Sequence, residues 1–110
     1  MPFDKIDIDS ITEERRKSVA KSIRTASGEE LRKLGDEVFH DLDDPWREEF
    51  FKFIEEHSDT TIYHAVASDG VHMLYCPDKD KGIWFLPGVG KGVLSPAGRQ
   101  MMKEAVGGRS

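Results

Sequence analysis

The segment from residue 60 to residue 76 constrains the fold more than any other part of this 110-residue chain. Residues 60–67 and 71–76 are rich in β-branched and aromatic side chains, a composition typical of β-strands. Between them, Asp69-Gly70 is a dipeptide favoured in two-residue hairpin turns. The segment therefore predicts an antiparallel β-hairpin, around which the rest of the chain must pack.

The length of the turn decides which side chains share a face of this hairpin. With a two-residue turn, His64 lies opposite Tyr75, and His64 and His72 project from opposite faces of the sheet. Imidazoles on opposite faces cannot bind the same ion, and Cys76, the only cysteine, has no CxxC companion. We therefore predict no metal site and no cofactor.

Helix signals precede the hairpin. Thr12, followed by acidic residues and then by a run of bases, indicates the start of a first helix. Ser27 and Glu30 form a capping box for a second helix, whose apolar stripe runs to about Leu42. Pro45 fits the first position of a third helix, where its missing amide hydrogen is not needed. The first half of the chain thus predicts three helices.

The region after the hairpin predicts one more strand and one more helix. The apolar run Ile83–Leu86 extends the hairpin into a meander. Ser95 and Pro96 indicate a helix start, and Gly107-Gly108 indicates its end. The predicted fold class is α+β, with three N-terminal helices, a three-stranded antiparallel β-meander and a C-terminal helix. The helices are expected mainly on one side of the sheet.

Size and charge restrict the function. The chain has the size of a single domain, which we expect over 1–110 with flexible ends at 1–11 and 107–110. Its net charge of −5 repels a nucleic-acid backbone, so nucleic acid is an unfavoured partner. The first residues lack the features of a signal peptide, and no apolar run is long enough to span a bilayer. We expect a cytoplasmic protein without membrane contact.

Apolar residues exceed what one thin sheet and four short helices need for a core, and neither face of the predicted hairpin is polar. A partner that covers the excess would explain it. We therefore predict a small protein-binding or adaptor module, whose partner is another protein or a second copy in a homodimer. The predicted interaction surface comprises Tyr63, His72, Cys76, Trp84 and Phe51.

Two other functions stay open. A small anion- or phosphate-binding enzyme would use the glycine-rich loop and the helix start that follows it. The candidate anion ligands are Gly88, Gly90, Lys91, Gly92, Ser95 and Arg99. No catalytic residues are singled out, because the one cysteine has no histidine within predicted reach. Nucleic-acid binding would instead use the bases of the first helix, which are Arg15, Arg16, Lys17, Lys21 and Arg24.

The five residues Leu86-Pro87-Gly88-Val89-Gly90 resemble the hairpin of the helix-hairpin-helix family of DNA-binding motifs. In that family, glycine amides of the hairpin approach a phosphate, and a helix lies on each side. Here residues 82–85 predict a strand, and Pro96 interrupts any early second helix. We therefore expect a glycine-rich turn at this position.

Overall fold

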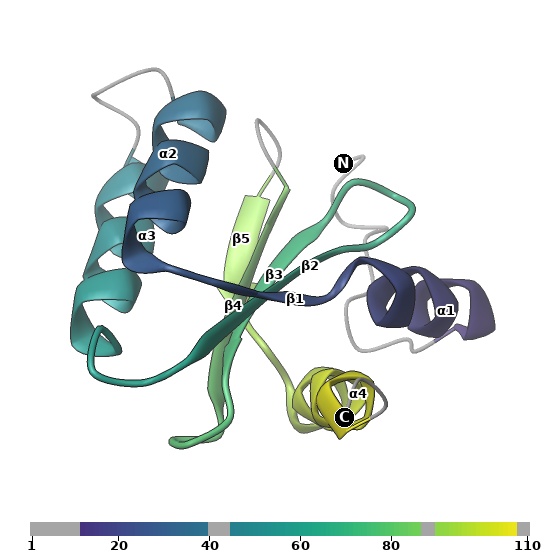
Figure 1. The fold of residues 1–110 in the computed structure, drawn as a ribbon. Coiled ribbons are helices and arrows are strands. Elements are labelled where there is room, and N and C mark those ends of the chain that lie inside the picture. Colours follow the sequence, from purple (N-terminus) through teal and green to yellow (C-terminus); the bar gives the residue numbers. More distant parts are fainter. Residues whose placement is uncertain (1–11, 40–44, 87–89, 108–110) are drawn as a thin grey trace.

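Five antiparallel strands form the centre of the molecule, and helices lie on both of their faces (Figure 1). The structure is a computed structural model that describes residues 12–39, 45–86 and 90–107. In these ranges the helices are α1 (Glu13–Ser22), α2 (Gly28–Val38), α3 (Pro45–Glu56) and α4 (Pro96–Gly107). The strands, which neighbour one another in chain order, are β1 (Arg24–Ala26), β2 (Ile62–Val66), β3 (His72–Cys76), β4 (Lys81–Leu86) and β5 (Gly90–Val93).

The predicted α+β class is confirmed, but its details are not. The sheet has five strands instead of three, and β1 separates α1 from α2. The predicted flexible ends lie outside the described residues, except for Gly107, the last residue of α4.

Each face of the sheet packs against helices in its own hydrophobic cluster. α2 and α3 cover one face, where Leu74, Cys76 and Phe85 are buried (Figure 1). α1 and α4 cover the other face, where Met73 and Tyr75 are buried. Successive side chains of a strand project to opposite faces, so β3, which is apolar on both, needs cover on both sides. The expectation that the helices lie mainly on one side is therefore wrong.

The β2–β3 hairpin is present, but its register differs by one residue from the predicted one. Three residues, 68–70, form the loop instead of two. Gly70 has a φ of +90°, the left-handed conformation that the last residue of a three-residue loop adopts. His64 consequently lies opposite Leu74, and His64 and His72 project from the same face.

β1 forms where the sequence signals continue the first helix to Arg24. The helix ends at Ser22, whose hydroxyl accepts a hydrogen bond from the Val66 N–H and donates one to the Val66 carbonyl, both at 2.9 Å. The next residue, Ile23, is fully buried, and Arg24 then pairs opposite His64. Three residues are too few for an alternating pattern to indicate a strand, so β1 depends on the neighbouring β2.

β5 forms where the sequence predicts a loop. Glycine weakens an isolated strand, yet Gly90–Val93 pairs with β4, and Gly92 lies opposite Trp84. A Cβ atom on Gly92 would lie 2.7 Å from the indole Nε1 of Trp84. The indole therefore packs against β5 because position 92 has no side chain. Residues 87–89 of the predicted turn lie outside the described residues.

The predicted helix starts are confirmed. Thr12 and Ser27 cap α1 and α2, and each side-chain oxygen accepts a hydrogen bond of 3.1 Å from the backbone N–H three residues later. Pro45 and Pro96 are the first residues of α3 and α4. α2 ends at Val38, four residues before the predicted end near Leu42, because the backbone of Phe39 leaves the helical conformation.

Gly82 lies where the sheet leaves no room for a side chain. A Cβ atom there would collide with Leu94 Cδ1 and lie 2.7 Å from the backbone oxygen of Leu74. We expect Gly82→Ala to lower the free energy of unfolding by about 1–3 kcal/mol, the usual cost of overpacking, in urea denaturation. Gly28→Ala is the control, since a Cβ there meets nothing within 4 Å. An equal loss in both variants would contradict the steric explanation.

Candidate functional site

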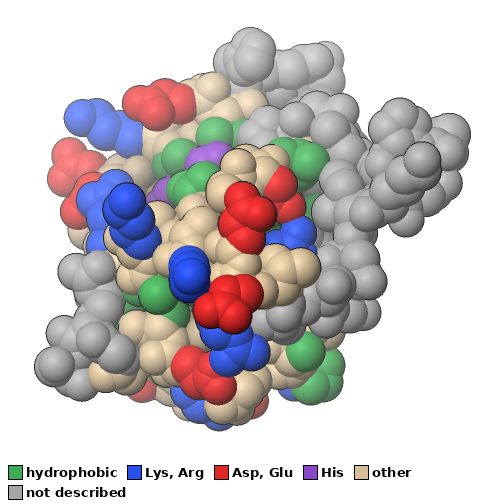
Figure 2. Space-filling view, turned by 90° about the vertical axis from the view of Figure 1, so that its right-hand side faces the viewer, with side chains coloured by type: hydrophobic (Ala, Val, Ile, Leu, Met, Phe, Trp, Pro, Cys, Tyr) green, Lys and Arg blue, Asp and Glu red, His purple; other side chains and the backbone are tan. Residues whose placement is uncertain are grey.

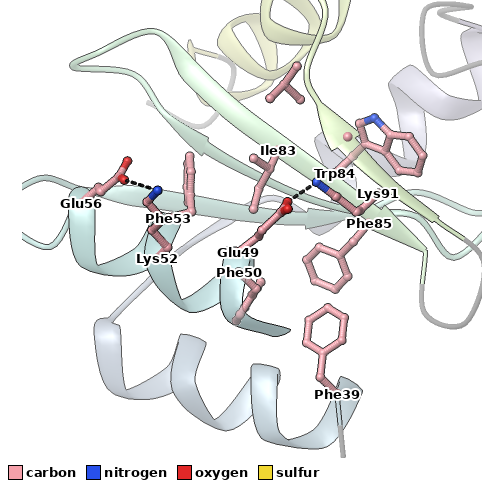
Figure 3. A pocket seen from close by; sticks show the side chains of 12 residues that line it. Phe39, Glu49, Phe50, Lys52, Phe53, Glu56, Ile83, Trp84, Phe85 and Lys91 are labelled. Carbon is pink, nitrogen blue, oxygen red and sulfur yellow. Dashed lines mark hydrogen bonds and ion pairs between the residues drawn. The ribbon is translucent and has the colours of Figure 1, made fainter. Parts of the chain in front are cut away.

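A groove of about 370 Å³ lies between α3 and the β4–β5 edge of the sheet (Figure 3). Its apolar lining residues are Phe39, Phe50, Phe53, Ile83, Trp84, Phe85 and Val93. Its charged lining residues are Glu49, Lys52, Glu56 and Lys91. Binding sites commonly have about 300–1,000 Å³ of volume and a mainly apolar lining with a few polar groups. The groove has both properties.

Helix and strand periodicity bring the lining residues together. Phe50 and Phe53, three residues apart on α3, are both buried and line the groove from the helix side. On β4, Ile83 and Phe85 pack in the α2–α3 cluster, whereas Trp84 between them packs mainly in the α1–α4 cluster. The sequence predicts the buried stripe of α3, but it does not show which strand residues face it.

Phe85 is the centre of the aromatic floor of the groove. Its side chain is 2% exposed, and its ring centroid lies 5.3 Å from that of Phe39, 5.2 Å from that of Phe50 and 4.9 Å from that of His72. Aromatic rings attract one another at such separations. Phe51 packs against α2 instead. The aromatic surplus of α3 is therefore largely covered within the chain.

Two ion pairs lie along the rim of the groove. Lys91 of β5 pairs with Glu49 of α3, and Lys52 Nζ lies 4.0 Å from Glu56 Oε1 on α3 itself (Figure 3). Exposed pairs of this kind contribute only about 0–1 kcal/mol each, so an incoming ligand can rearrange them at small cost.

The groove lies beside an open edge of the sheet. In the described part of the chain, β5 has a strand neighbour on one side only. The Leu94 N–H donates to the Gly82 carbonyl at 2.9 Å, which fixes the alternation of hydrogen bonds between β4 and β5. By that alternation, the backbone N–H and C=O groups of Lys91 and Val93 point away from β4. The side chains of Lys91 and Val93 line the groove.

Two histidines meet next to this floor. His64 Nε2 and His72 Nδ1 lie 3.0 Å apart, within hydrogen-bond distance, and the two ring planes differ by only 3°. The ring of His72 is also parallel, within 5°, to that of Phe85. Histidine side chains reach the surface among hydrophobic ones in Figure 2. The prediction that the two histidines project from opposite faces is wrong, because the three-residue loop shifts the register by one.

Burial keeps both imidazoles neutral at pH 7. Desolvation, with smaller contributions from His72 and Arg24, lowers the pKa of His64 from its usual 6.5 to about 4. Desolvation also lowers the pKa of His72. Among the described residues, no group of three His, Cys, Asp or Glu side chains is placed to hold a metal ion.

The residues of the predicted interaction surface do not form one surface. Tyr63 and Trp84 pack in the α1–α4 cluster, whereas Cys76 and Phe51 pack in the α2–α3 cluster. His72 lies on the α2–α3 face beside Phe85. The shifted register separates the set, because it moves the β2 residue Tyr63 to the face opposite His72 and Cys76. Cys76 is fully buried and therefore unavailable to a partner.

The two cations among the predicted anion ligands lie on different faces of the sheet. Lys91 lines the groove under α3 and pairs with Glu49. Arg99 belongs to α4 on the other face, where its Nε lies 3.6 Å from Asp80 Oδ2. Each cation already faces a carboxylate, so the structure does not assemble them into an anion site.

The remaining predicted anion ligands have structural roles where the structure describes them. Gly90 and Gly92 belong to β5, and Gly88 lies outside the described residues. The Ser95 hydroxyl accepts a hydrogen bond of 3.1 Å from the Gly98 N–H at the start of α4. It therefore acts as a helix cap.

The bases of the first helix are largely neutralised by carboxylates. Figure 2 shows acidic and basic side chains interspersed over the face that it presents. Arg24 lies in β1 rather than in α1. The ion pairs are Arg15–Asp69 at 2.6 Å, Arg16–Glu104 at 2.7 Å, Lys17–Glu13 at 3.7 Å and Arg24–Glu30 at 3.1 Å. A phosphate backbone would have to displace these carboxylates.

Comparison of the chain with protein-family models, with curated proteins and with solved structures found no match. No helix in the described ranges has the length and apolar character that crossing a membrane requires. The functional conclusion therefore depends on the geometry of the groove and of the strand edge beside it.

Proposed function

We propose that the chain is a protein-binding module that holds an extended segment of a partner protein along the open edge of β5. The observation that supports this function is the position of the groove directly beside that edge. An added strand bonds through its backbone to Lys91 and Val93, and its alternate side chains enter the groove. Backbone bonds then supply affinity, and the groove supplies selectivity.

Exposure of apolar surface favours this edge over the rest of the molecule. Val93 is 77% exposed, and in 12–39, 47–86 and 91–107 it is the only large hydrophobic side chain that is mainly exposed. Both faces of the sheet are already covered by helices, so apolar surface and free backbone groups coincide at β5. The anion alternative lacks this support because Lys91 and Arg99 lie on different faces and each faces a carboxylate. The nucleic-acid alternative lacks it because most of its cations pair with carboxylates.

β5 itself restricts which segments bind. It has only four residues, and lysine on an edge strand, as at Lys91, disfavours indiscriminate pairing. Backbone pairing over so short a strand needs additional contacts to be stable. We therefore expect a bound segment to place a bulky apolar side chain in the groove, between α3 and Val93.

Replacing Val93 by proline tests this function. Proline removes the outward N–H of an edge position without removing a hydrogen bond to β4. The probe is a peptide selected on the native protein from linear peptides of about eight residues, longer than a typical strand of roughly five. We expect the peptide to shift the amide resonances of Lys91 and Val93. We expect Val93→Pro to weaken binding at least about tenfold, the effect of losing one good hydrogen bond.

The matched control is Val93→Thr, which keeps the N–H and a β-branched shape and should change affinity less than about threefold. Equal binding of the peptide to native protein and to Val93→Pro excludes strand addition, as does a selection that yields no binding peptide. Sedimentation shows whether the partner is a second copy of the chain or another protein. A dimer that forms with rising concentration and is lost in Val93→Pro identifies a second copy of the chain as the bound partner.

A further inference from the structure

The hydrogen bond between His64 and His72 limits how many protons the two rings can hold. At 3.0 Å between Nε2 and Nδ1, one nitrogen carries the hydrogen and the other accepts it. The neutral pair satisfies this requirement, and so does the pair with one extra proton on an outward nitrogen. With two extra protons both facing nitrogens carry hydrogen, and attraction becomes repulsion.

In residues 12–39, 45–86 and 90–107, few groups compensate a second positive charge on the pair. The charged side chains that line the same hollow as His64 are Arg24, Glu30, Lys33 and Glu37. Glu30 already pairs with Arg24 at 3.1 Å, and the influences on the pKa of His64 are desolvation, His72 and Arg24, all of which lower it, with no contribution from Glu30 or Glu37. On the other side, the apolar ring of Phe85 lies against His72, and Lys91 of β5, which lies opposite Phe85, pairs with Glu49 of α3. No carboxylate in the described part of the chain bonds to either imidazole.

We propose that His64 and His72 form one shared binding site for a single proton, and that a second proton breaks the packing of the two imidazoles on each other and on Phe85. The ligand of this site is the hydrogen ion itself. The site exists whether or not β5 binds a partner, because neither histidine belongs to the lining of the groove.

The direction of the pH effect follows from burial. Histidines of the unfolded chain take up protons near pH 6.5, whereas desolvation lowers the pKa of both His64 and His72 in the fold. Below pH 6.5, acid therefore favours states in which the pair is open to water. Because the two rings are coupled, the titration steps belong to the pair and not to either residue alone.

Observation of the imidazole nitrogens by NMR across pH 7 to 3 tests the proposal on the native chain. At pH 7 we expect one facing nitrogen to be protonated and the other not. On acidification, we expect the nitrogen resonances of both rings to shift together as the pair takes up its first proton. The second proton should bind at least about tenfold more weakly than the first. Its binding should coincide with loss of the native NMR signals of Phe85. His57, at the end of α3, is the internal reference, since it does not contact the pair.

Two results would overturn the proposal. One is independent titration of the two rings in single steps near pH 6.5. The other is a doubly protonated pair that keeps the native signals of Phe85. His64→Gln adds a further check, because the remaining His72 should then titrate in one step. If that variant does not fold, two observations on the native chain still test the proposal. They are which facing nitrogen carries hydrogen at pH 7, and whether the two protons bind in separate steps.

Discussion

Replacing Phe85 by alanine is expected to lower the free energy of unfolding by about 3–5 kcal/mol, the usual cost of deleting a buried phenyl ring. Phe85 is 2% exposed and contacts rings from three other elements or their ends: Phe39, Phe50 and His72. Its removal leaves a cavity in the α2–α3 cluster that these rigid rings cannot readily fill. A domain of this size has only about 5–15 kcal/mol of stability, so the variant should be close to unfolding.

Urea denaturation of two further variants checks the cause of this loss. Phe85→Leu keeps most of the buried volume and should lose less than half as much stability. Val93→Ala, which truncates the exposed side chain of the neighbouring strand, should change the free energy of unfolding by no more than about 0.5 kcal/mol. A Phe85→Ala variant as stable as Val93→Ala would show that the aromatic floor is not packed as described.

Acid is expected to destabilise the fold over a defined range of pH. The pKa of His64 is about 4 in the fold and near 6.5 in the unfolded chain. The unfolded chain therefore binds a proton that the folded chain does not, and stability falls as the pH decreases from 6.5 towards 4. The loss from this residue reaches about 3 kcal/mol near pH 4 and levels off at lower pH.

Comparison with His64→Gln isolates that contribution from the general effects of acid. Urea denaturation of both proteins at pH 7, 5.5 and 4 gives the pH dependence of each. We expect the native chain to lose more stability than the variant over this range, because glutamine does not take up a proton when the chain unfolds. Parallel curves for the two proteins would mean that His64 is not the source of the acid sensitivity.

Local sequence was enough to predict where the helices start because the start signals act over a few residues. The Thr12 and Ser27 caps bond to amides three residues away, and Pro45 and Pro96 fit first helical positions by their own geometry. The hairpin could be predicted in the same way, because its strands are adjacent in the chain and Gly70 marks the loop. These features depend on neighbours in the sequence.

The candidate site could be predicted only in part from the sequence. The stripe with Phe50 and Phe53 on α3 indicated one wall of the groove. Its other wall depends on β5, whose glycines give no strand signal and whose pairing with β4 is supported by the packing of Trp84 on Gly92. Lys91 was therefore interpreted as an anion ligand in a loop, whereas it lies on an edge strand paired with Glu49.

By itself, the sequence determined where helices begin and that a hairpin follows them. The expected excess of apolar side chains over what the sheet and four helices can cover is largely absent, because α2–α3 and α1–α4 cover both faces of the sheet. Only the tertiary structure decided which face each strand residue occupies and which strand edge stays open. The physical reason is that a one-residue change of register costs little locally, yet it moves every side chain of a strand to the other face. Burial against α2–α3 and α1–α4 selects one register, and that choice brings His64 to His72 and places Lys91 and Val93 beside the groove.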